Sequence, residues 1–390
     1  MMSGISSSTT DIRPDIRPND VRPNDVRWMG RALELAERGL GMTSPNPAVG
    51  AVIVANGRAL GEGFHARAGA PHAEVEALAA AGALARGSDL YVTLEPCNHA
   101  GRTAPCVEAI ARAGVRRVVA AVTDVNPKVA GGGARALAAA GVDVTLGCRE
   151  REAIALNRAF FTVARLGRPH VTLKWAATLD GKTADHERSS RWISGGRART
   201  EAHRLRSWSD AVVVGIGTAL ADDPALDVRL ATPWPREPLR VVVDSRARLP
   251  LHARVLTAGS PSRAVVAVTD LADPERVAAL EARGVTVLRC KEGDGRVEPA
   301  DLLARLGALD VTGLLLEGGG ELAASFLRAG LVDRIVAFVA PMLLGGRDAP
   351  GPLAGSGLRL PEAFEMIRLE ARPVGNDWML EGDVAAAREA

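Results

Sequence analysis

The chain alternates between segments with the apolar periodicity of helices and short apolar runs typical of strands. Met29, Leu33, Ala36 and Leu40 recur at helical spacing, so residues 28–40 are predicted to form a helix. Residues 48–65 predict two strands joined at Asn56-Gly57, a dipeptide that favours the tight turn of a hairpin. These segments indicate the start of a layered α/β unit.

Helices and strands continue to alternate as far as residue 165. Helices are predicted at 71–87, 105–114, 131–141 and 149–165, and strands at 88–96, 116–124 and 142–147. This alternation is typical of a sheet with several parallel strands and helices on its faces.

A second α/β series follows residues 166–170, which contain a glycine and a proline. Strands are predicted at 171–178, 211–215, 239–244, 264–268, 285–289, 313–319 and 333–340, and helices at 197–206, 273–284 and 321–330. The chain has 390 residues, which is more than one ordinary core holds. We therefore predict two α/β domains, residues 27–167 and residues 168–390, with the boundary near Gly167.

The N-terminal segment differs from both domains. Residues 11–27 repeat a short polar unit with prolines and mixed charge, and residues 1–27 contain no apolar run that resembles a signal peptide. Because the segment has little apolar surface to bury, residues 1–26 are predicted to be a disordered tail.

Composition narrows the functional class. The net charge is +2 and aromatic residues make up 3% of the chain, so the sequence lacks the basic, base-stacking surface of a nucleic-acid-binding protein. No apolar run is long enough to span a bilayer. Four cysteines do not make a disulfide scaffold. We expect a cytoplasmic enzyme that acts on a small molecule and binds neither membrane nor nucleic acid.

Two of the four cysteines lie close together, in YVTLEPCNHAGRTAPC (residues 91–106). Cys97 and Cys106, with His72 from an earlier His-Ala-Glu motif, are strong zinc ligands, and three protein ligands leave a fourth position for water. Zinc lowers the pKa of bound water to ~7, and Glu74 is placed to shuttle protons. Pro71 predicts that His72 and Glu74 lie at a helix entrance, and Pro105 predicts that Cys106 begins a helix.

Three kinds of site remain possible for this cluster. A disulfide would join Cys97 to Cys106, and a structural zinc site would need a fourth ligand, for which His99 is the local candidate. The ordered His-x-Glu and Pro-Cys motifs favour the third possibility, the catalytic zinc site of nucleobase deaminases. The chain departs from the common Pro-Cys-x-x-Cys spacing, since eight residues separate its cysteines.

The motifs HAEVEAL, TLEPCNHAGRTAPC and TDVNPKVAGGG together resemble the bifunctional riboflavin biosynthesis deaminase–reductases, from about Trp28 to the end of the chain. The resemblance implies a cytidine-deaminase-like three-layer domain that removes an exocyclic amine from a phosphoribosylated diaminopyrimidine. It also implies that His72, Cys97 and Cys106 hold Zn²⁺ and that Glu74 is the catalytic proton shuttle. The residues implied to line the substrate pocket are Asn46, His65, His99, Arg102, Asp124 and Asn126.

The second domain lacks a strand–GxGxxG–helix fingerprint, but LLLEGGGELAASFL predicts an anion cradle at a helix N-terminus. WAATLDGKTA, SSRWISG, HRLRSW and VGIGTALADDPALDVR resemble the reductase half of the same family. The resemblance implies a dihydrofolate-reductase-like α/β fold, NADPH as cofactor and reduction of a ribosyl group to ribityl.

The same resemblance implies two sets of contacts in this domain. The substrate set is Lys174, Ser190, Arg206, Leu226, Arg229 and Glu317. The cofactor set is Ala176, Trp192, Thr218, Asp222, Ser245, Gly319, Gly320, Glu321, Leu322, Ala323, Ala324 and Ser325. Arg206 and Arg229 suit a phosphate group, because guanidinium donors pair with its oxygens in a fork. Lys174 and Asp180 are candidates for supplying a proton to the reduced oxygen.

Two other functions are weighed against this hypothesis. One is a zinc deaminase of another nucleotide or of a nucleic-acid base, with a non-catalytic second domain; the low charge and few aromatics disfavour a nucleic acid. The other is a zinc-stabilised binding protein, which requires a closed site with four ligands. By analogy with enzymes of this class we also expect a homo-oligomer with its interface in the reductase half.

Overall fold

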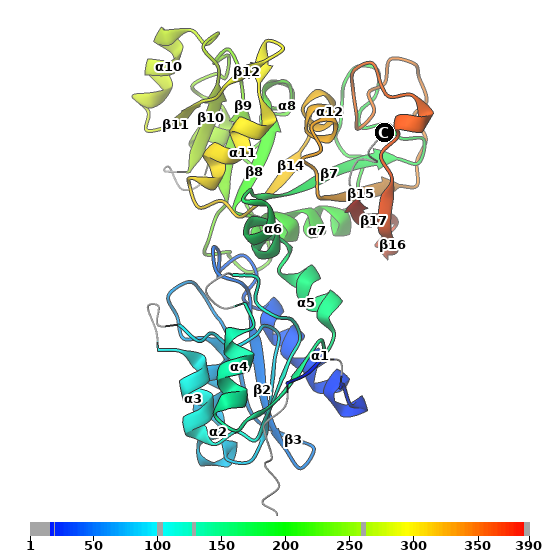
Figure 1. The fold of residues 1–390 in the computed structure, drawn as a ribbon. Coiled ribbons are helices and arrows are strands. Elements are labelled where there is room, and N and C mark those ends of the chain that lie inside the picture. The colour runs from blue at the N-terminus through cyan, green and yellow to red at the C-terminus, as the bar shows by residue number, and fades with distance from the viewer. Residues whose placement is uncertain (1–15, 19, 100–103, 127–129, 259–262, 386–390) are drawn as a thin grey trace, which may run out of the picture. The chain divides into compact units, whose positions relative to one another are not determined.

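The computed structural model describes residues 16–18, 20–99, 104–126, 130–258 and 263–385. The chain divides into two compact units between Arg165 and Leu166, next to the predicted boundary at Gly167 (Figure 1). Each unit is an α/β structure with its own sheet.

The sheet of the first unit has strand order β1-β6-β5-β4-β2-β3. Its strands are β1 (Ile16–Pro18), β2 (Gly50–Ala55), β3 (Arg58–Phe64), β4 (Asp89–Val92), β5 (Arg117–Ala120) and β6 (Asp143–Leu146). Strands β4, β5, β6 and β1 are parallel, whereas β2 runs antiparallel to β3 and β4. The predicted hairpin turn is confirmed: Asn56 and Gly57 both have positive φ.

Helices cover both faces of this sheet. They are α1 (Pro23–Glu37), α2 (Ala73–Ala81), α3 (Cys106–Ala113), α4 (Gly132–Ala139), α5 (Glu150–Leu156) and α6 (Arg158–Leu166), with a short 3₁₀ turn η1 (Gly82–Ala85). Ala51 and Ile53 of β2 pack with α2, α3 and α4, while Val52 and Val54 pack with α1 and α5. Successive residues of a strand point to opposite faces, so this division makes three layers.

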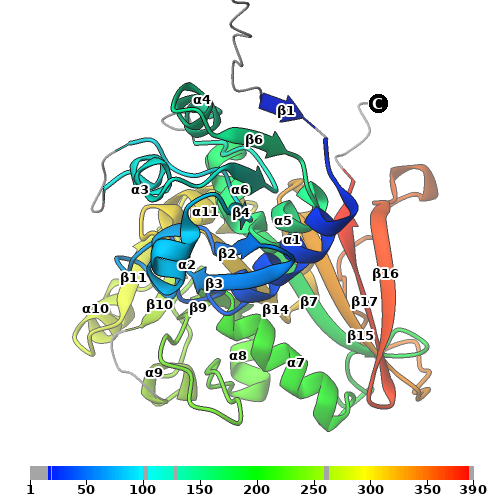
Figure 2. The same ribbon diagram turned by 90° about the horizontal axis from the view of Figure 1, so that it is seen from below.

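The prediction of a disordered tail over residues 1–26 is wrong for part of that range. Ile16–Pro18 pair in parallel with Val144–Leu146 at the edge of the sheet (Figure 2), and α1 begins at Pro23, five positions before Trp28. Proline is suited to the first turn of a helix, and the carboxylate of Asp25 accepts a hydrogen bond from the backbone N–H of Arg22 at 2.9 Å.

A tertiary contact explains why this polar segment is ordered. Asp25 is buried and forms a two-bonded ion pair with the buried Arg117 of β5, at 3.0 and 2.8 Å, and accepts a hydrogen bond from Tyr91. A buried ion pair with its hydrogen bonds satisfied holds the start of α1 against the sheet. The repeat alone gives no sign of this partner.

The single helix predicted at 149–165 is two helices, α5 and α6, which meet at Asn157. The side chain of Asn157 accepts a hydrogen bond from the N–H of Ala48 at 2.8 Å and donates one to its carbonyl at 2.9 Å. These bonds tie the break to the loop before β2.

The sheet of the second unit has strand order β11-β10-β9-β8-β14-β7-β15-β17-β16. Its strands are β7 (His170–Thr178), β8 (Ala211–Gly215), β9 (Leu239–Val243), β10 (Ala264–Val268), β11 (Thr286–Arg289), β14 (Gly313–Glu317), β15 (Arg334–Ala340), β16 (Met366–Val374) and β17 (Asp377–Val384); β12 (Glu292–Gly293) and β13 (Arg296–Val297) form a separate pair. The first seven strands of the order are parallel, and the hairpin of β16 and β17 adds to β15 in antiparallel fashion. This hairpin was not predicted.

Helices also cover both faces of the second sheet. They are α7 (Gly196–Ser207), α8 (Ile216–Asp222), α9 (Arg254–Thr257), α10 (Pro274–Glu281), α11 (Pro299–Gly307) and α12 (Gly320–Arg328), with a 3₁₀ turn η2 (Leu360–Glu362). Leu314 and Leu316 of β14 pack with α11 and α12, and Leu315 between them packs with α7. Among the described residues, no helix combines the length and the apolar character needed to cross a bilayer.

Candidate active sites

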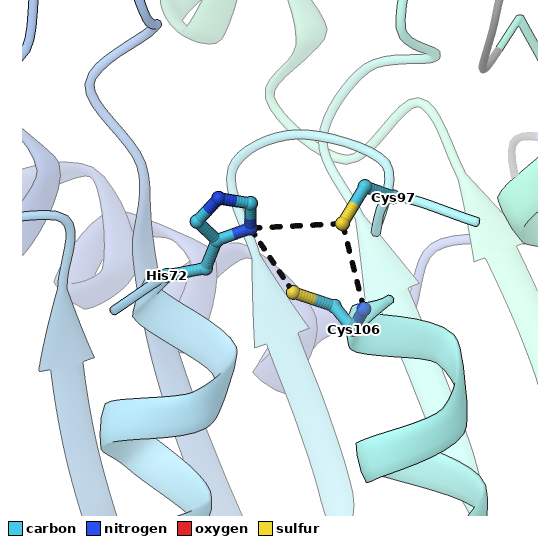
Figure 3. Close-up of side chains that lie close together, drawn as sticks. All are labelled: His72, Cys97 and Cys106. Atoms are coloured by element: carbon cyan, nitrogen blue, oxygen red, sulfur yellow. Dashed lines mark hydrogen bonds between the residues drawn. The ribbon is translucent and has the colours of Figure 1, made fainter. Parts of the chain in front are cut away.

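Three metal-ligating side chains meet in the first unit (Figure 3). The ligand atoms of His72, Cys97 and Cys106 lie within 4.8 Å of one another; His72 Nδ1 is 3.2 Å from Cys106 Sγ and 3.6 Å from Cys97 Sγ. One imidazole and two thiolates form a donor set that zinc prefers. The residues present therefore fit the predicted metal.

Local structure aims these side chains at one point. His72 is the N-cap of α2, which places Glu74 in its first turn, and Cys106 is the first residue of α3, as predicted. Cys97 lies in the loop after β4, and its carbonyl accepts a hydrogen bond from the N–H of Val107 at 3.2 Å. This bond ties the loop to the start of α3, so both cysteines are held together.

The electrostatics of the cluster favour a cation. A hydrogen bond from the Cys106 thiol lowers the pKa of Cys97 to about 4, whereas the Cys97 thiolate and burial raise the pKa of Cys106. One thiolate thus forms readily, and a bound dication would stabilise the second. Burial also raises the pKa of Glu74, which makes its carboxyl group a stronger proton acceptor than an exposed one.

The geometry favours one of the alternatives. Cys97 and Cys106 are not joined in a disulfide. Within the part of the chain that the structure describes, the cluster contains three ligands, and His99 is not among them. An open three-ligand arrangement is that of a catalytic zinc site rather than a closed structural one.

One predicted pocket residue, His65, lies against the candidate ligand His72, and a second, Asn46, lies next to His65. The ring of His65 meets the ring of His72 edge-on, with centroids 5.5 Å apart, and Asn46 Nδ2 is 3.5 Å from His65 Nε2. His65 Nδ1 is 3.0 Å from the carbonyl of Pro71, and burial lowers the pKa of His65. A neutral ring that donates from Nδ1 to this carbonyl presents Nε2 as an acceptor.

The other predicted pocket residues come from two loops. His99 follows the Cys97 loop and is half-buried, while Asp124 and Asn126 follow β5. Asp124 Oδ1 accepts a hydrogen bond from the N–H of Asn126 at 2.8 Å, and burial raises the pKa of Asp124. The prediction for Arg102 falls outside the described residues.

In the second unit, three predicted substrate residues form a buried charged group. Arg206 donates from Nε and Nη2 to the two carboxylate oxygens of Glu317, at 2.7 and 3.0 Å, and from Nη1 to the carbonyl of Asp227 at 3.0 Å. Lys174 Nζ is 3.5 Å from Glu317. Burial alone would raise the pKa of Glu317, but Arg206 and Lys174 lower it to about 2.

The predicted glycine cradle lies between β14 and α12. Gly318 and Gly319 have φ of +75° and +88°, and a Cβ on either glycine would come within 3.4 Å of the hydroxyl of Thr218. Bare backbone N–H groups at the start of a helix can receive a phosphate only where no side chain fills the space. The residues present therefore fit a dinucleotide phosphate beside Thr218.

Three further cofactor residues, Trp192, Asp222 and Ser245, and the substrate residue Ser190 lie in loops or on a helix end. Ser190 donates to the carboxylate of Asp222 at 3.1 Å, and Trp192 is exposed, with the guanidinium of Arg199 4.5 Å from its ring centroid. Ser245 accepts a hydrogen bond from the N–H of Val297.

The remaining predicted reductase contacts differ in burial and in their place in the fold. Leu226 is buried at positive φ, and the side chain of Arg229 is exposed. Ala176, Gly320, Glu321, Leu322, Ala323, Ala324 and Ser325 lie on β7 or α12, where Ala323 and Ala324 pack inward. The candidate proton donor Asp180 is ionised at neutral pH, because Thr178 and the N–H of Gly345 lower its pKa to about 2.

Sequence analysis missed two residues that contact these sites. His203 accepts a hydrogen bond from the N–H of Arg229 at 3.1 Å, and burial lowers its pKa to about 4. Glu95, two positions before Cys97, is a buried carboxylate. The sequence does give one sign of Glu95, because a charged residue stands at the end of an apolar strand segment in TLEPC, residues 93–97.

Comparison with known proteins identifies a family for each unit. Residues 169–380 match the family model for the RibD C-terminal domain, and residues 22–122 match the cytidine and deoxycytidylate deaminase zinc-binding region. The riboflavin biosynthesis protein RibD of Aquifex aeolicus is 42% identical over 354 residues, which cover 90% of this chain and 96% of that protein. This chain belongs to the RibD family.

RibD proteins from other bacteria and their structures agree with the assignment. RibD of Escherichia coli is 42% identical over 363 residues, covering 90% of this chain and 96% of that protein. The structure of Acinetobacter baumannii RibD matches with a TM-score of 0.83 at 39% identity, and covers 93% of this chain and 99% of that one. The predicted fold class is confirmed: a cytidine-deaminase-like domain precedes a RibD reductase domain.

As a RibD family member, the chain is a bifunctional enzyme of riboflavin biosynthesis with a zinc-dependent deaminase domain and a reductase domain of the NADPH-using type. It acts on a small molecule. A zinc deaminase with a non-catalytic second domain, and a zinc-stabilised binding protein, do not fit a chain that matches RibD over both units.

Proposed function

We propose that the first unit hydrolytically deaminates 2,5-diamino-6-(5-phosphoribosylamino)pyrimidin-4-one. The second unit then uses NADPH to reduce the ribosyl group of the product, 5-amino-6-(5-phosphoribosylamino)uracil, to ribityl. A Thermotoga maritima structure whose name gives these two activities matches with a TM-score of 0.78 at 34% identity, covering 93% of this chain and 99% of that one. The observation that carries the proposal is the three-ligand cluster beside the buried Glu74.

We assign His72, Cys97 and Cys106 as the ligands of Zn²⁺ and Glu74 as the catalytic residue of the deaminase. When bound, zinc supplies the acidity that makes water a nucleophile at neutral pH. Glu74 takes the proton from the attacking water and passes it to the departing amine. Its burial supports this role, because a raised pKa makes the carboxyl group able both to take and to give a proton.

We assign the pyrimidine and its phosphoribosyl group to the surface formed by Asn46, His65, His99, Asp124 and Asn126. Neutral His65 and Asn46 offer an acceptor and donors beside the metal ligands, and Asp124 offers a carboxylate at the next loop. Arg102, which lies outside the described residues, is assigned to the same pocket from the family resemblance.

In the reductase, NADPH supplies the hydride when bound, and the turn at Gly318 and Gly319 receives its phosphate groups. The Nε, Nη1 and Nη2 groups of Arg206 already donate to Glu317 and Asp227. Arg206 therefore positions Glu317 and the loop at Asp227. The side chain of Arg229 is exposed, so Arg229 is the better candidate for binding the substrate phosphate. Lys174, Ser190, Leu226 and Glu317 are assigned to the rest of the substrate.

One experiment tests both steps. Purified protein is incubated with the diaminopyrimidine nucleotide, and products are followed by mass spectrometry with and without NADPH. Without NADPH we expect the deaminated ribosyl compound to accumulate, and with NADPH we expect its ribityl counterpart. Absence of the deaminated product in both reactions, from zinc-loaded protein, would contradict the proposal.

We further propose that the protein is a cytoplasmic homo-oligomer that binds no nucleic acid. Edge strand β16 is exposed along most of its length, and its hairpin carries the exposed apolar side chains Ile367, Leu369 and Trp378. Light scattering of wild-type protein should show a dimer or larger species, and Leu369→Asp should shift it toward monomer.

A further inference from the structure

The loop that carries Cys97 begins with a buried carboxylate, that of Glu95, which is 3% exposed. Its Oε2 accepts hydrogen bonds from the N–H groups of Asp124 at 3.1 Å and Gly131 at 2.9 Å. Its Oε1 accepts one from the N–H of Ala134 at 2.9 Å. One side chain thus holds both ends of the segment from Asp124 to Gly131 and the first turn of α4.

The backbone shows the same close approach. A Cβ on Gly133 would lie 1.9 Å from the carbonyl oxygen of Pro96, and a Cβ on Gly132 would lie 2.3 Å from Asn98 Nδ2. The first turn of α4 therefore packs directly on the loop that contains Cys97. Glycine at these two positions lets the carboxylate of Glu95 reach the amides of α4.

The chemistry of Glu95 suits a positioning role. Among the described residues, the hydrogen-bond donors to its carboxylate are three backbone amides. Burying a carboxylate is costly, and hydrogen bonds from amides at a helix N-terminus offset that cost. An apolar residue would fill the same space without the cost of burying a charge. The carboxylate instead fixes the distance between two loops, because it bonds to defined atoms of both.

We propose that Glu95 is a positioning residue for the deaminase substrate. It holds the segment that begins with Asp124 and Asn126 at a fixed distance from the Cys97 loop, so that the pocket is formed before substrate binds. This inference rests on the proposed function, which places Asp124 and Asn126 in the pyrimidine pocket.

The test compares Glu95→Gln and Glu95→Asp in the full-length, zinc-loaded protein. Glutamine keeps one acceptor oxygen and turns an N–H₂ group toward backbone N–H groups, while aspartate is too short to reach both oxygens' partners. We expect the KM for the diaminopyrimidine nucleotide to rise about tenfold or more, with a smaller change in kcat. Zinc content and reductase activity in the same chain should stay at wild-type values.

A direct structural readout accompanies the kinetics. Hydrogen exchange at the amides of Asp124, Gly131 and Ala134 should become faster in both variants. Glu108→Gln is the matched control, because Glu108 lies on α3 of the same unit with a side chain that is 59% exposed. Its KM and exchange should equal those of the wild type.

The outcomes separate the two proposals. If wild-type protein does not deaminate the nucleotide, the proposed function fails, whatever the variants do. If wild-type protein is active but both Glu95 variants keep its KM or its amide exchange, the positioning role is wrong. Loss of zinc or unfolding of the first unit in both variants would also overturn it, since Glu95 would then serve the fold and not substrate position.

Discussion

At the scale of single residues, the chemistry of the deaminase site is local in sequence. His72 and Glu74 share one motif, Cys97 and Cys106 share another, and each pair stands at a helix entrance or a strand end. The residues can therefore be predicted from their spacing. Glu95 could not, because its three amide partners lie 29 to 39 positions further along the chain.

Replacing Glu74 by glutamine should separate metal binding from proton transfer. Glu74→Gln keeps the size of the side chain but cannot shuttle a proton, so deamination should slow by roughly 10²- to 10⁴-fold. Zinc content and reductase activity should not change, and both are measured on the same sample. Deamination at the wild-type rate would show that Glu74 is not the proton shuttle.

Glu317 should make the second unit sensitive to acid. Its pKa is lowered from 4.5 to about 2 although burial opposes this, because Arg206 and Lys174 stabilise the carboxylate. The stabilisation is complete above pH 4.5 and is lost as pH falls toward 2. Urea unfolding followed through reductase-unit fluorescence should show the free energy of unfolding falling over this window.

Glu317→Gln is the matching variant for that experiment. It leaves Arg206 buried without a counter-charge, which costs about 3–5 kcal/mol at neutral pH. The variant should also lose the part of the acid dependence that comes from Glu317. If the variant shows the same pH profile as the wild type, another carboxyl group causes the loss of stability at low pH.

At the scale of elements, glycines set how closely helices approach the first sheet. A Cβ on Gly50 would lie 2.0 Å from the carbonyl of Ala32 in α1, and a Cβ on Gly63 would lie 2.4 Å from the carbonyl of Ala73 in α2. Helix α2 begins directly after His72. The hairpin therefore fixes the position of a metal ligand through backbone contact.

Gly63→Ala should displace the start of α2. Overpacking of this kind costs about 1–3 kcal/mol, and the shift of His72 should also weaken zinc binding. Thermal unfolding and zinc titration measure the two effects. Gly217→Ala is the control, because a Cβ there meets nothing within 4 Å, and it should leave both measurements unchanged.

At the scale of the whole molecule, each unit has its own sheet and its own hydrophobic clusters. The ligands of the metal cluster all come from the first unit, and the glycine cradle lies in the second. Each unit should therefore respond to its own ligand, because a ligand stabilises the fold that binds it.

Removing zinc with a chelator should abolish deamination and lower the calorimetric transition of the first unit. The reductase should stay active, and NADPH should raise the temperature of the calorimetric transition of the second unit. Re-addition of zinc should restore deamination. Loss of reductase activity on chelation, in protein that remains folded, would contradict independent units.

The sequence by itself determined the two α/β series, the hairpin at Asn56-Gly57 and the candidate metal ligands, because periodicity, turn chemistry and short motifs are local properties of the chain. Tertiary structure decided that part of the N-terminal segment is ordered, because Asp25 bonds to Arg117. It also decided the break between α5 and α6 at Asn157, whose side chain bonds to the backbone of Ala48. It also brought Arg206 together with Glu317 and Asp227, to which its Nε, Nη1 and Nη2 groups donate. In each case the deciding partner is distant in sequence, and a hydrogen bond between distant residues exists only once the chain has folded.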